Sequence, residues 1–430
     1  DDQHLVDEVT RNVKEIKTLA YDKAREQGLI EIIGAEIDEA YYAAVCPVSL
    51  SEERHVKIVY SPLHGTGLTS VYPILKKLGF DVTLDPATSN LSGAFENVTF
   101  NIPNPEVVES FDQSLPFARK VDADLLISTD PDADRIGVML KYNGDWRFLS
   151  GNEIGVILTQ YAISKYKAQG RLNPDNVIIK TDVTTSLIQK IASENGVQCI
   201  GDLLVGFKYI GNLMNKIEAD NKIEHFILGT EESHGYLMGN YARDKDAACA
   251  AIWLGEHAAE LKSKNKTLLD DLAEIYARYG YCHNYLTEIR LLGAKGMEQI
   301  SLIMDHLRDT RIEAFGDLSV RHKIDRRDGE PQPHLSRTDT SARNMLVYQL
   351  NNTPDTASLR VTVRPSGTEP KIKMYFEVFG KPFKLQDIEA SLKQSLSGDF
   401  EYCEGGTSLL LAALPTQSRY DTTGWLVRYL

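Results

Sequence analysis

Short apolar runs alternate with segments of helical periodicity over the first two thirds of the chain. In the helical segments, apolar residues recur every three or four positions, which is typical of amphipathic helices. In the apolar runs they follow one another directly, as in buried strands. We predict strands at 55–60, 81–84, 125–128, 176–180, 197–201 and 226–229, and helices at 71–78, 111–120, 154–161, 185–195 and 209–216. This alternation predicts an α/β fold with mostly parallel sheets.

The two ends of the chain show different patterns. The N-terminal segment is helical, with a break at Gly28 and with apolar residues spaced by three or four at Leu5, Val6, Val9, Val13, Ile16 and Leu19. After about Tyr285 we predict strands at 286–292, 359–363 and 371–378, helices at 297–307 and 387–396, and an exposed loop at 325–340.

These patterns divide the chain into five segments. We predict a helical remnant of a preceding domain or a linker at 1–45, an α/β domain at 46–149, a second α/β domain at 150–280, an α+β domain at 281–400 and an unassigned tail at 401–430. The two α/β segments are similar in length, and each contains a strand that runs into an acidic loop. This similarity suggests structural repetition.

Composition limits the partners of the chain. Its 430 residues are 42% hydrophobic and 25% charged, which is typical of a globular protein of about two to four domains. The net charge of -14 disfavours nucleic acid and anionic membranes as partners. A phosphorylated substrate would therefore need local clusters of Arg and Lys.

Cysteine usage predicts a cytoplasmic protein. The five cysteines are far apart, are odd in number and form no Cys-x-x-Cys pair, so we expect reduced thiols rather than disulfides or a zinc site. The sequence opens without a signal peptide, and no apolar run approaches the length needed to span a bilayer. We also expect further sequence upstream of Asp1.

Three carboxylates follow the apolar run that begins at Leu125. Asp130, Asp132 and Asp134 alternate along the chain, and in an extended backbone their side chains project to the same side. Such hard oxygen ligands suit Mg²⁺, Mn²⁺ or Ca²⁺. Arg135 and Lys141 stand where a calcium-binding hand needs glycine and glutamate, which argues against that motif. A solvated acidic turn and a phosphatase-type Asp-x-Asp pair remain as alternatives.

Two further loops combine polar groups suited to ligand binding. The segment from Arg364 to Pro370 offers a guanidinium, two hydroxyls and a glycine backbone to a phosphate, although a plain hairpin turn uses similar residues. The segment from Gly229 to Tyr236 offers carboxylates and a hydroxyl to sugar hydroxyls, with a solvated acidic loop as the alternative.

The three loops together resemble the α-D-phosphohexomutases, in particular the phosphoglucomutase and phosphomannomutase branch. The matching motifs are Asp-Pro-Asp-Ala-Asp-Arg, Gly-Thr-Glu-Glu-Ser-His-Gly and Arg-Pro-Ser-Gly-Thr-Glu-Pro, in the family's order and one to a domain. The resemblance implies the family's α/β domains two and three and a smaller α+β domain four. The family's phosphoserine loop in domain one has no counterpart in this sequence, so the chain resembles a phosphohexomutase without its N-terminal domain.

The resemblance also implies roles for individual residues. Asp130, Asp132 and Asp134 would bind Mg²⁺, Arg135 would lie against the substrate or the phosphoserine, and Lys208 would act as general acid/base or stabilise charge. The residues implied in substrate binding are Glu231 and Ser233 for the sugar hydroxyls, His234 and Lys180, and Arg364, Ser366, Gly367 and Thr368 for the non-transferring phosphate. His64, Arg243 and Lys245 match weaker family positions, as Lys180 does. The Glu-Glu-Ser form of the sugar loop resembles the family's glucose-type loop more than its mannose-type loop.

The implied activity is the exchange of a phosphoryl group between the 1- and 6-positions of a hexose. The family uses a phosphoserine and a bisphosphate intermediate, so glucose 1,6-bisphosphate would serve as intermediate or activator, and the chain alone would be inactive. One alternative is a catalytically silent sugar-phosphate-binding or regulatory protein. Another is a metal-dependent phosphatase with Asp130 as nucleophile, which leaves the loops at Glu231 and Arg364 unexplained.

Overall fold

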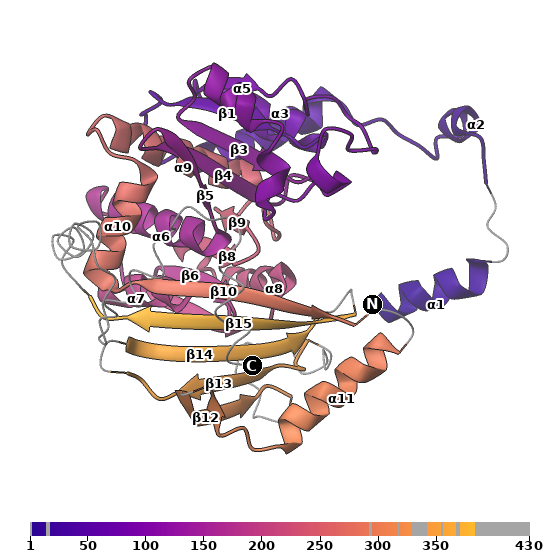
Figure 1. Ribbon diagram of the computed structural model, residues 1–430. Coiled ribbons are helices and arrows are strands. Elements are labelled where there is room, and N and C mark those ends of the chain that lie inside the picture. Colours follow the sequence, from indigo (N-terminus) through magenta and orange to yellow (C-terminus); the bar gives the residue numbers. More distant parts are fainter. Residues whose placement is uncertain are drawn as a thin grey trace. The chain divides into compact units, whose positions relative to one another are not determined.

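The computed structural model describes residues 2–13, 18–291, 295–316, 318–327, 342–353, 356–366 and 370–382, and it divides into two units, 1–44 and 45–430 (Figure 1). The first unit contains the helices α1 (Asp2–Asn12), α2 (Tyr21–Glu26) and most of α3 (Ala35–Val45). Gly28, with a φ of 68°, follows α2 where the sequence predicts a break. The helical prediction for this segment is therefore right in type, but the structure has three shorter helices.

The second unit begins with a five-stranded sheet in the order β2-β1-β3-β4-β5. Its strands are β1 (Lys57–Ser61), β2 (Asp81–Leu84), β3 (Leu125–Thr129), β4 (Ile136–Tyr142) and β5 (Asp145–Leu149), and its helices are α4 (Val71–Lys77) and α5 (Leu115–Lys120). β1 pairs in parallel with β2 and β3, whereas β4 is antiparallel to β3 and β5.

A four-stranded sheet follows, in the order β7-β6-β8-β9. Its strands are β6 (Val177–Thr181), β7 (Gln198–Leu203), β8 (Phe226–Glu231) and β9 (Gly235–Met238), and its helices are α6 (Gly151–Ala168), α7 (Ser186–Glu194), α8 (Phe207–Ala219), α9 (Ala247–Lys262) and α10 (Leu268–Tyr279). β6 is parallel to β7 and β8, and β9 is antiparallel to β8.

Both sheets are mixed, with parallel pairing among β2, β1 and β3 and among β7, β6 and β8, as predicted, and with antiparallel strands added at one edge. Only residues 130–135 lie between β3 and β4, and only residues 232–234 lie between β8 and β9. A parallel connection needs a dozen or more residues, so in both places the chain turns back beside the strand it has just left. The two acidic loops are therefore hairpin turns at the carboxyl ends of central strands.

The third sheet is antiparallel throughout, in the order β10-β15-β14-β13-β12-β11 (Figure 1). Its elements are β10 (Cys282–Arg290), α11 (Gly296–Asp309), β11 (Ala314–Phe315), β12 (Leu318–Asp325), β13 (Leu346–Leu350), β14 (Thr356–Pro365) and β15 (Lys371–Gly380). The predicted α+β domain is confirmed. The predicted helix at 387–396, the tail and most of the loop at 325–340 lie outside the described residues.

The third sheet has two buried faces. On one face, Leu346 and Val361 pack against Ile300 and Met304 of α11. Val347, one position along β13, projects to the opposite face and joins the core that contains Leu203 and Ile210. The third sheet is thus packed against the layer that contains the four-stranded sheet.

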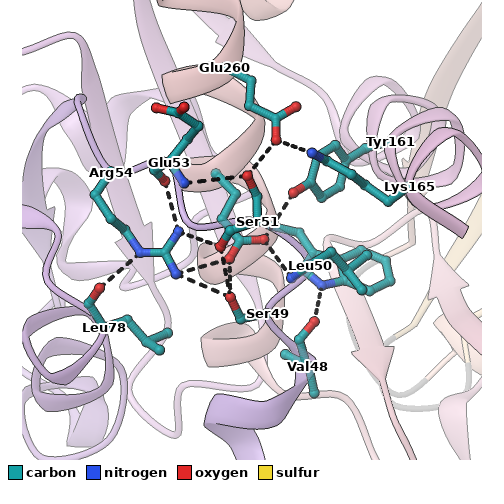
Figure 2. A network of polar contacts seen from close by, with 12 residues as sticks. Val48, Ser49, Leu50, Ser51, Glu53, Arg54, Leu78, Tyr161, Lys165 and Glu260 are labelled. Atoms are coloured by element: carbon teal, nitrogen blue, oxygen red, sulfur yellow. Dashed lines mark hydrogen bonds and ion pairs between the residues drawn. The ribbon is translucent and has the colours of Figure 1, made fainter. Parts of the chain in front are cut away.

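Two buried polar networks join the layers. In one network, the fully buried Glu256 of α9 accepts hydrogen bonds from the Leu50 amide (3.0 Å), the Tyr161 hydroxyl (2.9 Å) and Ser49, and its carboxylate lies 3.2 Å from Arg54 Nη2. Figure 2 shows Ser49, Leu50, Arg54 and Tyr161 gathered in this network. Because these donors come from α6 and from the segment before β1, Glu256 ties the five-stranded sheet to the helices of the four-stranded one.

The other network joins the four-stranded and six-stranded sheets. Asp182, 4% exposed, accepts from Nε and Nη2 of Arg326 (3.0 and 2.7 Å) and from Arg360. Burial raises the pKa of this carboxyl, but the charges of Arg360 and Arg326 outweigh it and lower the pKa overall. No helix among the described residues has the length and hydropathy of a membrane-spanning segment.

Candidate active site

The carboxylates that follow β3 converge because the loop curls. The Asp130 carboxylate accepts hydrogen bonds on Oδ1 from the amides of Asp134 (3.1 Å) and Arg135 (2.9 Å), and Ala133 adopts a left-handed conformation with a φ of 58°. One oxygen each of Asp130, Asp132 and Asp134 lies within 4.8 Å of the others. The sequence argument assumed an extended backbone, whereas the structure brings the three carboxylates together by a turn.

The electrostatics of these three carboxylates fit a divalent cation. The Asp130 side chain is 13% exposed, and burial together with the charges of Asp134 and Asp132 raises its pKa above the usual range. Asp134 Oδ1 is buried and has no hydrogen-bond partner among the described residues. A bound Mg²⁺ or Mn²⁺ would ligate this oxygen and relieve the repulsion, so the donor set suits a hard cation.

Two protein cations lie against this metal triad, which we define as Asp130, Asp132 and Asp134. Lys245 Nζ is 2.6 Å from Asp134 Oδ2, and Arg135 Nε is 3.7 Å from Asp134 Oδ1 and 3.8 Å from Asp130 Oδ2. Gly235 makes room for the lysine, since a Cβ there would lie 2.5 Å from Lys245 Cδ. Lys245 matched only a weak family position in the sequence, yet the structure places it directly on the triad.

The sugar loop presents a buried glutamate, Glu231, and a half-buried one, Glu232. Glu231, 4% exposed, ends β8 and accepts from the Gly206 amide (2.9 Å). Burial and the neighbouring Glu232 raise the pKa of Glu231 to about 7. The hydroxyls of Thr181 and Thr184 donate to Glu232 Oε2 over 3.3 and 3.4 Å, and burial raises the pKa of this carboxyl too.

We call residues 130–135 the metal loop and residues 229–236 the sugar loop. His234 joins the sugar loop to the metal loop. Its Nδ1 lies 2.9 Å from the carbonyl oxygen of Ile136, and the Ile136 amide donates to the His234 carbonyl (3.1 Å). Because burial lowers the pKa of His234 to about 4, the ring is neutral near pH 7. A carbonyl only accepts, so Nδ1 carries the proton and Nε2 retains its lone pair.

A cavity of about 250 Å³ opens beside these loops. Three sheet layers line it, with Glu106 and Phe148 from the first, Asp182, Glu232 and His234 from the second, and Arg360, Thr362 and Tyr375 from the third. The metal triad is linked to this cavity through Arg135, whose Nη1 donates to Glu106 Oε1 over 2.6 Å.

The phosphate loop, residues 364–370, follows the part of β14 that lines the cavity. Arg364 lies two residues beyond Thr362 on β14, so its side chain projects to the same face, opposite Lys373 of β15. Its Nη1 donates to the Pro365 carbonyl (3.0 Å), while Nε is buried without a hydrogen-bond partner among the described residues. The charge of Arg364 lowers the pKa of Glu232 against the larger effect of burial, which places the guanidinium near the sugar loop.

Fewer contacts are described for the other predicted residues of the phosphate and sugar loops. Ser366 is 9% exposed, and its amide donates to the Lys371 carbonyl (2.8 Å). Ser233 lies partly buried in the turn between β8 and β9. Gly367 and Thr368, predicted to bind phosphate, lie outside the described residues.

Several sequence candidates point elsewhere. Lys180 is 2% exposed, and its ammonium donates to the carbonyls of Thr184 (2.9 Å), Thr181 (3.2 Å) and Gly201 (3.4 Å). In this structure the backbone therefore satisfies the Lys180 ammonium, which does not face the cavity. Lys208 is exposed in the first turn of α8, two residues after Gly206, with its ammonium 5.2 Å from the ring centre of Tyr209.

The side chains of Arg243 and His64 form hydrogen bonds or ion pairs with other groups of the protein. Arg243 pairs with Glu218 (2.6 Å) and donates to Asn215 (2.7 Å), both on α8. His64 is buried with Nδ1 2.8 Å from the Asn90 carbonyl, and the following Gly65 lies so near the metal loop that a Cβ would be 2.2 Å from Pro131 Cα.

Sequence reasoning missed Glu106, which contacts Arg135 and lines the cavity. A usable signal was present, because Glu106 follows Asn104 and Pro105, residues that favour a defined turn.

Comparison with known proteins places the chain in a family. Residues 39–144 match domain II (alpha/beta/alpha) of phosphoglucomutase/phosphomannomutase, and residues 150–279 match domain III. The two ranges cover more than half of the chain, which belongs to the phosphoglucomutase/phosphomannomutase family. In the family's domain numbering, the five-stranded sheet belongs to domain II and the four-stranded sheet to domain III. The antiparallel sheet belongs to a C-terminal domain.

Individual relatives agree with this assignment. A phosphoglucomutase of Staphylococcus saprophyticus is 31% identical over 360 residues, 82% of this chain and 63% of the relative, and one of Staphylococcus aureus is 34% identical over 322 residues, 74% and 56%. The chain thus spans about three fifths of the length of these relatives.

Solved structures show the same fold. A putative phosphomannomutase from Thermus thermophilus superposes with a TM-score of 0.55 at 17% identity, covering 84% of this chain and 66% of the other. A phosphoglucomutase/phosphomannomutase family protein from Burkholderia thailandensis gives 0.54 at 16% identity, covering 84% and 65%.

Proposed function

We propose that the chain carries the metal, sugar and phosphate sites of a phosphohexomutase of the phosphoglucomutase type, which interconverts hexose 1-phosphate and hexose 6-phosphate. One observation supports this most directly. The metal loop and the sugar loop are hydrogen-bonded to each other through His234 and Ile136. The sugar loop lines a cavity to which Arg360 and Thr362 of β14, the strand that leads into the phosphate loop, also contribute.

The acidic side of the cavity is suited to the reacting phosphoryl group. Asp130, Asp132 and Asp134 would hold Mg²⁺, which would supply positive charge to the phosphoryl oxygens as they develop charge. Arg135 and Lys245 add two protein cations at the same place. Glu231, with a pKa of about 7, has the proton affinity expected of a group that exchanges hydrogen bonds with sugar hydroxyls.

The basic side is suited to the phosphate that does not react. Arg364 and Lys373 are cross-strand neighbours on β14 and β15, and a guanidinium beside an ammonium can bind a phosphate at several oxygens. A mutase must accept either phosphate of a hexose bisphosphate at this place, and charge recognition from one wall tolerates both orientations of the sugar.

We propose that this chain alone binds its ligand without turnover. The relatives extend beyond the matched region, and the family's phosphoserine loop has no counterpart in the sequence. The preferred ligand would be a glucose phosphate, as implied by the Glu-Glu-Ser form of the sugar loop, with glucose 1,6-bisphosphate as intermediate.

The test is calorimetric titration of the chain with glucose 1,6-bisphosphate, with and without Mg²⁺. We expect saturable binding that strengthens with Mg²⁺ and weakens by about 10- to 100-fold in Arg364→Ala, because a charge-assisted hydrogen bond contributes about 1.5–3 kcal/mol. Arg311→Ala is the matched control, since Arg311 belongs to the same domain with its side chain 91% exposed.

Two outcomes would contradict the proposal. Absence of binding at millimolar ligand would contradict the proposed sugar-phosphate site. Equal weakening of binding in both arginine variants would contradict the proposed role of the phosphate loop. A silent binding protein gives the same titration, so conversion of glucose 1-phosphate by the longest natural form of the protein separates the two functions.

A further inference from the structure

Glu106 stands between the cavity and the metal triad. Its Oε1 accepts from Arg135 Nη1 over 2.6 Å, and the two side chains are 27% and 33% exposed. Glu106 also lines the cavity, and its charge contributes to the raised pKa of Glu232. The carboxylate therefore interacts with the metal loop on one side and the sugar loop on the other.

The local structure fixes the position of Glu106. Its amide donates to Asn104 Oδ1 (3.0 Å), and Ser110 Oγ donates to the Asn104 carbonyl (2.7 Å), so the Asn-Pro-Glu turn is held from both sides. Strand β4 presses on this turn at Gly137, where a Cβ would lie 2.4 Å from the Pro105 carbonyl oxygen. Because Gly137 follows Arg135 by two residues, this close approach sets Glu106 opposite the guanidinium.

Arg135 would compete with a metal ion if nothing restrained it. Its Nε is 3.7–3.8 Å from two carboxylates of the triad, close enough for an ion pair but too far for a hydrogen bond. The arginine backbone is tied to Asp130, so the guanidinium cannot move far from the triad. The orientation of the guanidinium then depends on whether Glu106 or the triad carboxylates bind it more tightly.

We infer that Glu106 is a positioning residue that holds the Arg135 guanidinium toward the cavity and off the metal triad, which leaves the triad free for a divalent cation. The inference rests on the proposed metal site. Without Glu106, the guanidinium is expected to close on Asp130 and Asp134, where its charge opposes metal binding. The same contact presents the remaining N–H groups of Arg135 between the triad and the cavity.

The experiment is titration of the chain with Mn²⁺, following free ion by electron paramagnetic resonance. Glu106→Gln, which keeps the size and removes the charge, should lower Mn²⁺ affinity about tenfold, at the lower end of effects measured for groups that orient metal sites. Glu109→Gln is the matched control. Glu109 is a half-buried glutamate of the same loop, and the ion pairs described for Arg135 are with Glu106, Asp130 and Asp134.

A thermodynamic cycle with Arg135 isolates the mechanism. In an Arg135→Gln background the Glu106→Gln effect should shrink to that of Glu109→Gln, because no guanidinium remains to be positioned. An undiminished effect in that background, or an equal effect of Glu109→Gln, overturns the inference. Glu106→Asp keeps the charge and should fall between wild type and Glu106→Gln, which provides a second variant if Glu106→Gln does not fold.

The outcomes also separate this inference from the proposed function. If the wild-type chain binds no Mn²⁺, the metal site itself is wrong and the role of Glu106 falls with it. If the wild type binds Mn²⁺ and glucose 1,6-bisphosphate but Glu106→Gln binds the metal equally well, only the positioning role is wrong.

Discussion

The two sides of the cavity have opposite electrostatic states. On the acidic side, burial raises the pKa values of Asp130, Glu231 and Glu232, and neighbouring carboxylates add to the effect. On the basic side, Arg326 and Arg360 at Asp182, and Lys371 and Lys373 at Glu288 of β10, outweigh burial and lower the pKa of each carboxyl. The difference shows that the carboxylates of the acidic side gain from an added cation, whereas Asp182 and Glu288 already have their counter-charges within the protein.

The comparison assigns different tasks to the two sides. The acidic side is a site whose charges are completed by a ligand, and it sits in short hairpin turns. On the basic side, the Asp182 ion pairs also hold the third sheet on the layer below. Substitutions on the basic side should therefore cost stability, and those on the acidic side should change ligand binding.

Removing the central carboxylate of the basic side should have the largest effect. Asp182→Asn leaves Arg326 and Arg360 buried without a full counter-charge, and breaking a buried ion pair costs about 3–5 kcal/mol. Urea unfolding of the chain measures the change in unfolding free energy. Asp175→Asn, at an exposed position of the same domain, should change it by less than about 0.5 kcal/mol.

Removing one carboxylate of the acidic side should abolish metal binding rather than folding. Asp130→Asn is expected to lower Mn²⁺ affinity by more than about 100-fold, beyond the range for residues that only orient ligands. The metal-free variant should be at least as stable as the wild type, since the substitution relieves repulsion with Asp132 and Asp134. Asp145→Asn is the control, because the Asp145 side chain is 72% exposed. Unchanged Mn²⁺ affinity in Asp130→Asn would contradict the proposed metal site.

The metal-free protein should lose stability as pH rises through neutrality. The pKa of Glu231 is about 7 in the folded state against 4.5 for a free glutamate, so between these values the folded state binds more protons than the unfolded state. The contribution of Glu231 to the unfolding free energy should thus be full below about pH 4.5 and fall by on the order of 1–3 kcal/mol as pH rises through about 7. Denaturant unfolding between pH 5 and 8 tests this, and Glu231→Gln should flatten the profile.

The smallest effect should come from the lysine on the triad. Lys245→Met removes the ammonium that pairs with Asp134 over 2.6 Å and keeps most of the side-chain volume. Mn²⁺ affinity should rise by up to about fivefold, the range of an ion pair near a protein surface. A fall in affinity would show instead that Lys245 helps to hold the triad in place. Lys264→Met, in the exposed turn after α9, is the control.

Local sequence predicted the elements that have a clear period or a clear boundary. The strands β1, β2, β3, β6, β7 and β8 and the helices α4, α5, α7 and α8 agree with the predictions to within a few residues, whereas α6 continues to Ala168, well beyond the predicted end at 161. α9 and α10 went unpredicted. Nearly every residue of α9 from Ala247 to Leu261 is buried, so the helix has no polar face and no amphipathic period to reveal it. α10 had a local signal, the capping box of Thr267 and Asp270.

The sequence by itself determined which chemistry gathers in each loop, because turn residues and charged side chains next to a buried strand are local features. It located Asp130, Glu231 and Arg364 at strand ends. Only the tertiary structure decided that Lys245 pairs with the triad, that Glu106 pairs with Arg135 and that Lys180 turns inward to backbone carbonyls. These outcomes depend on which strands pair and how closely backbones approach, and such long-range contacts leave no period in the chain.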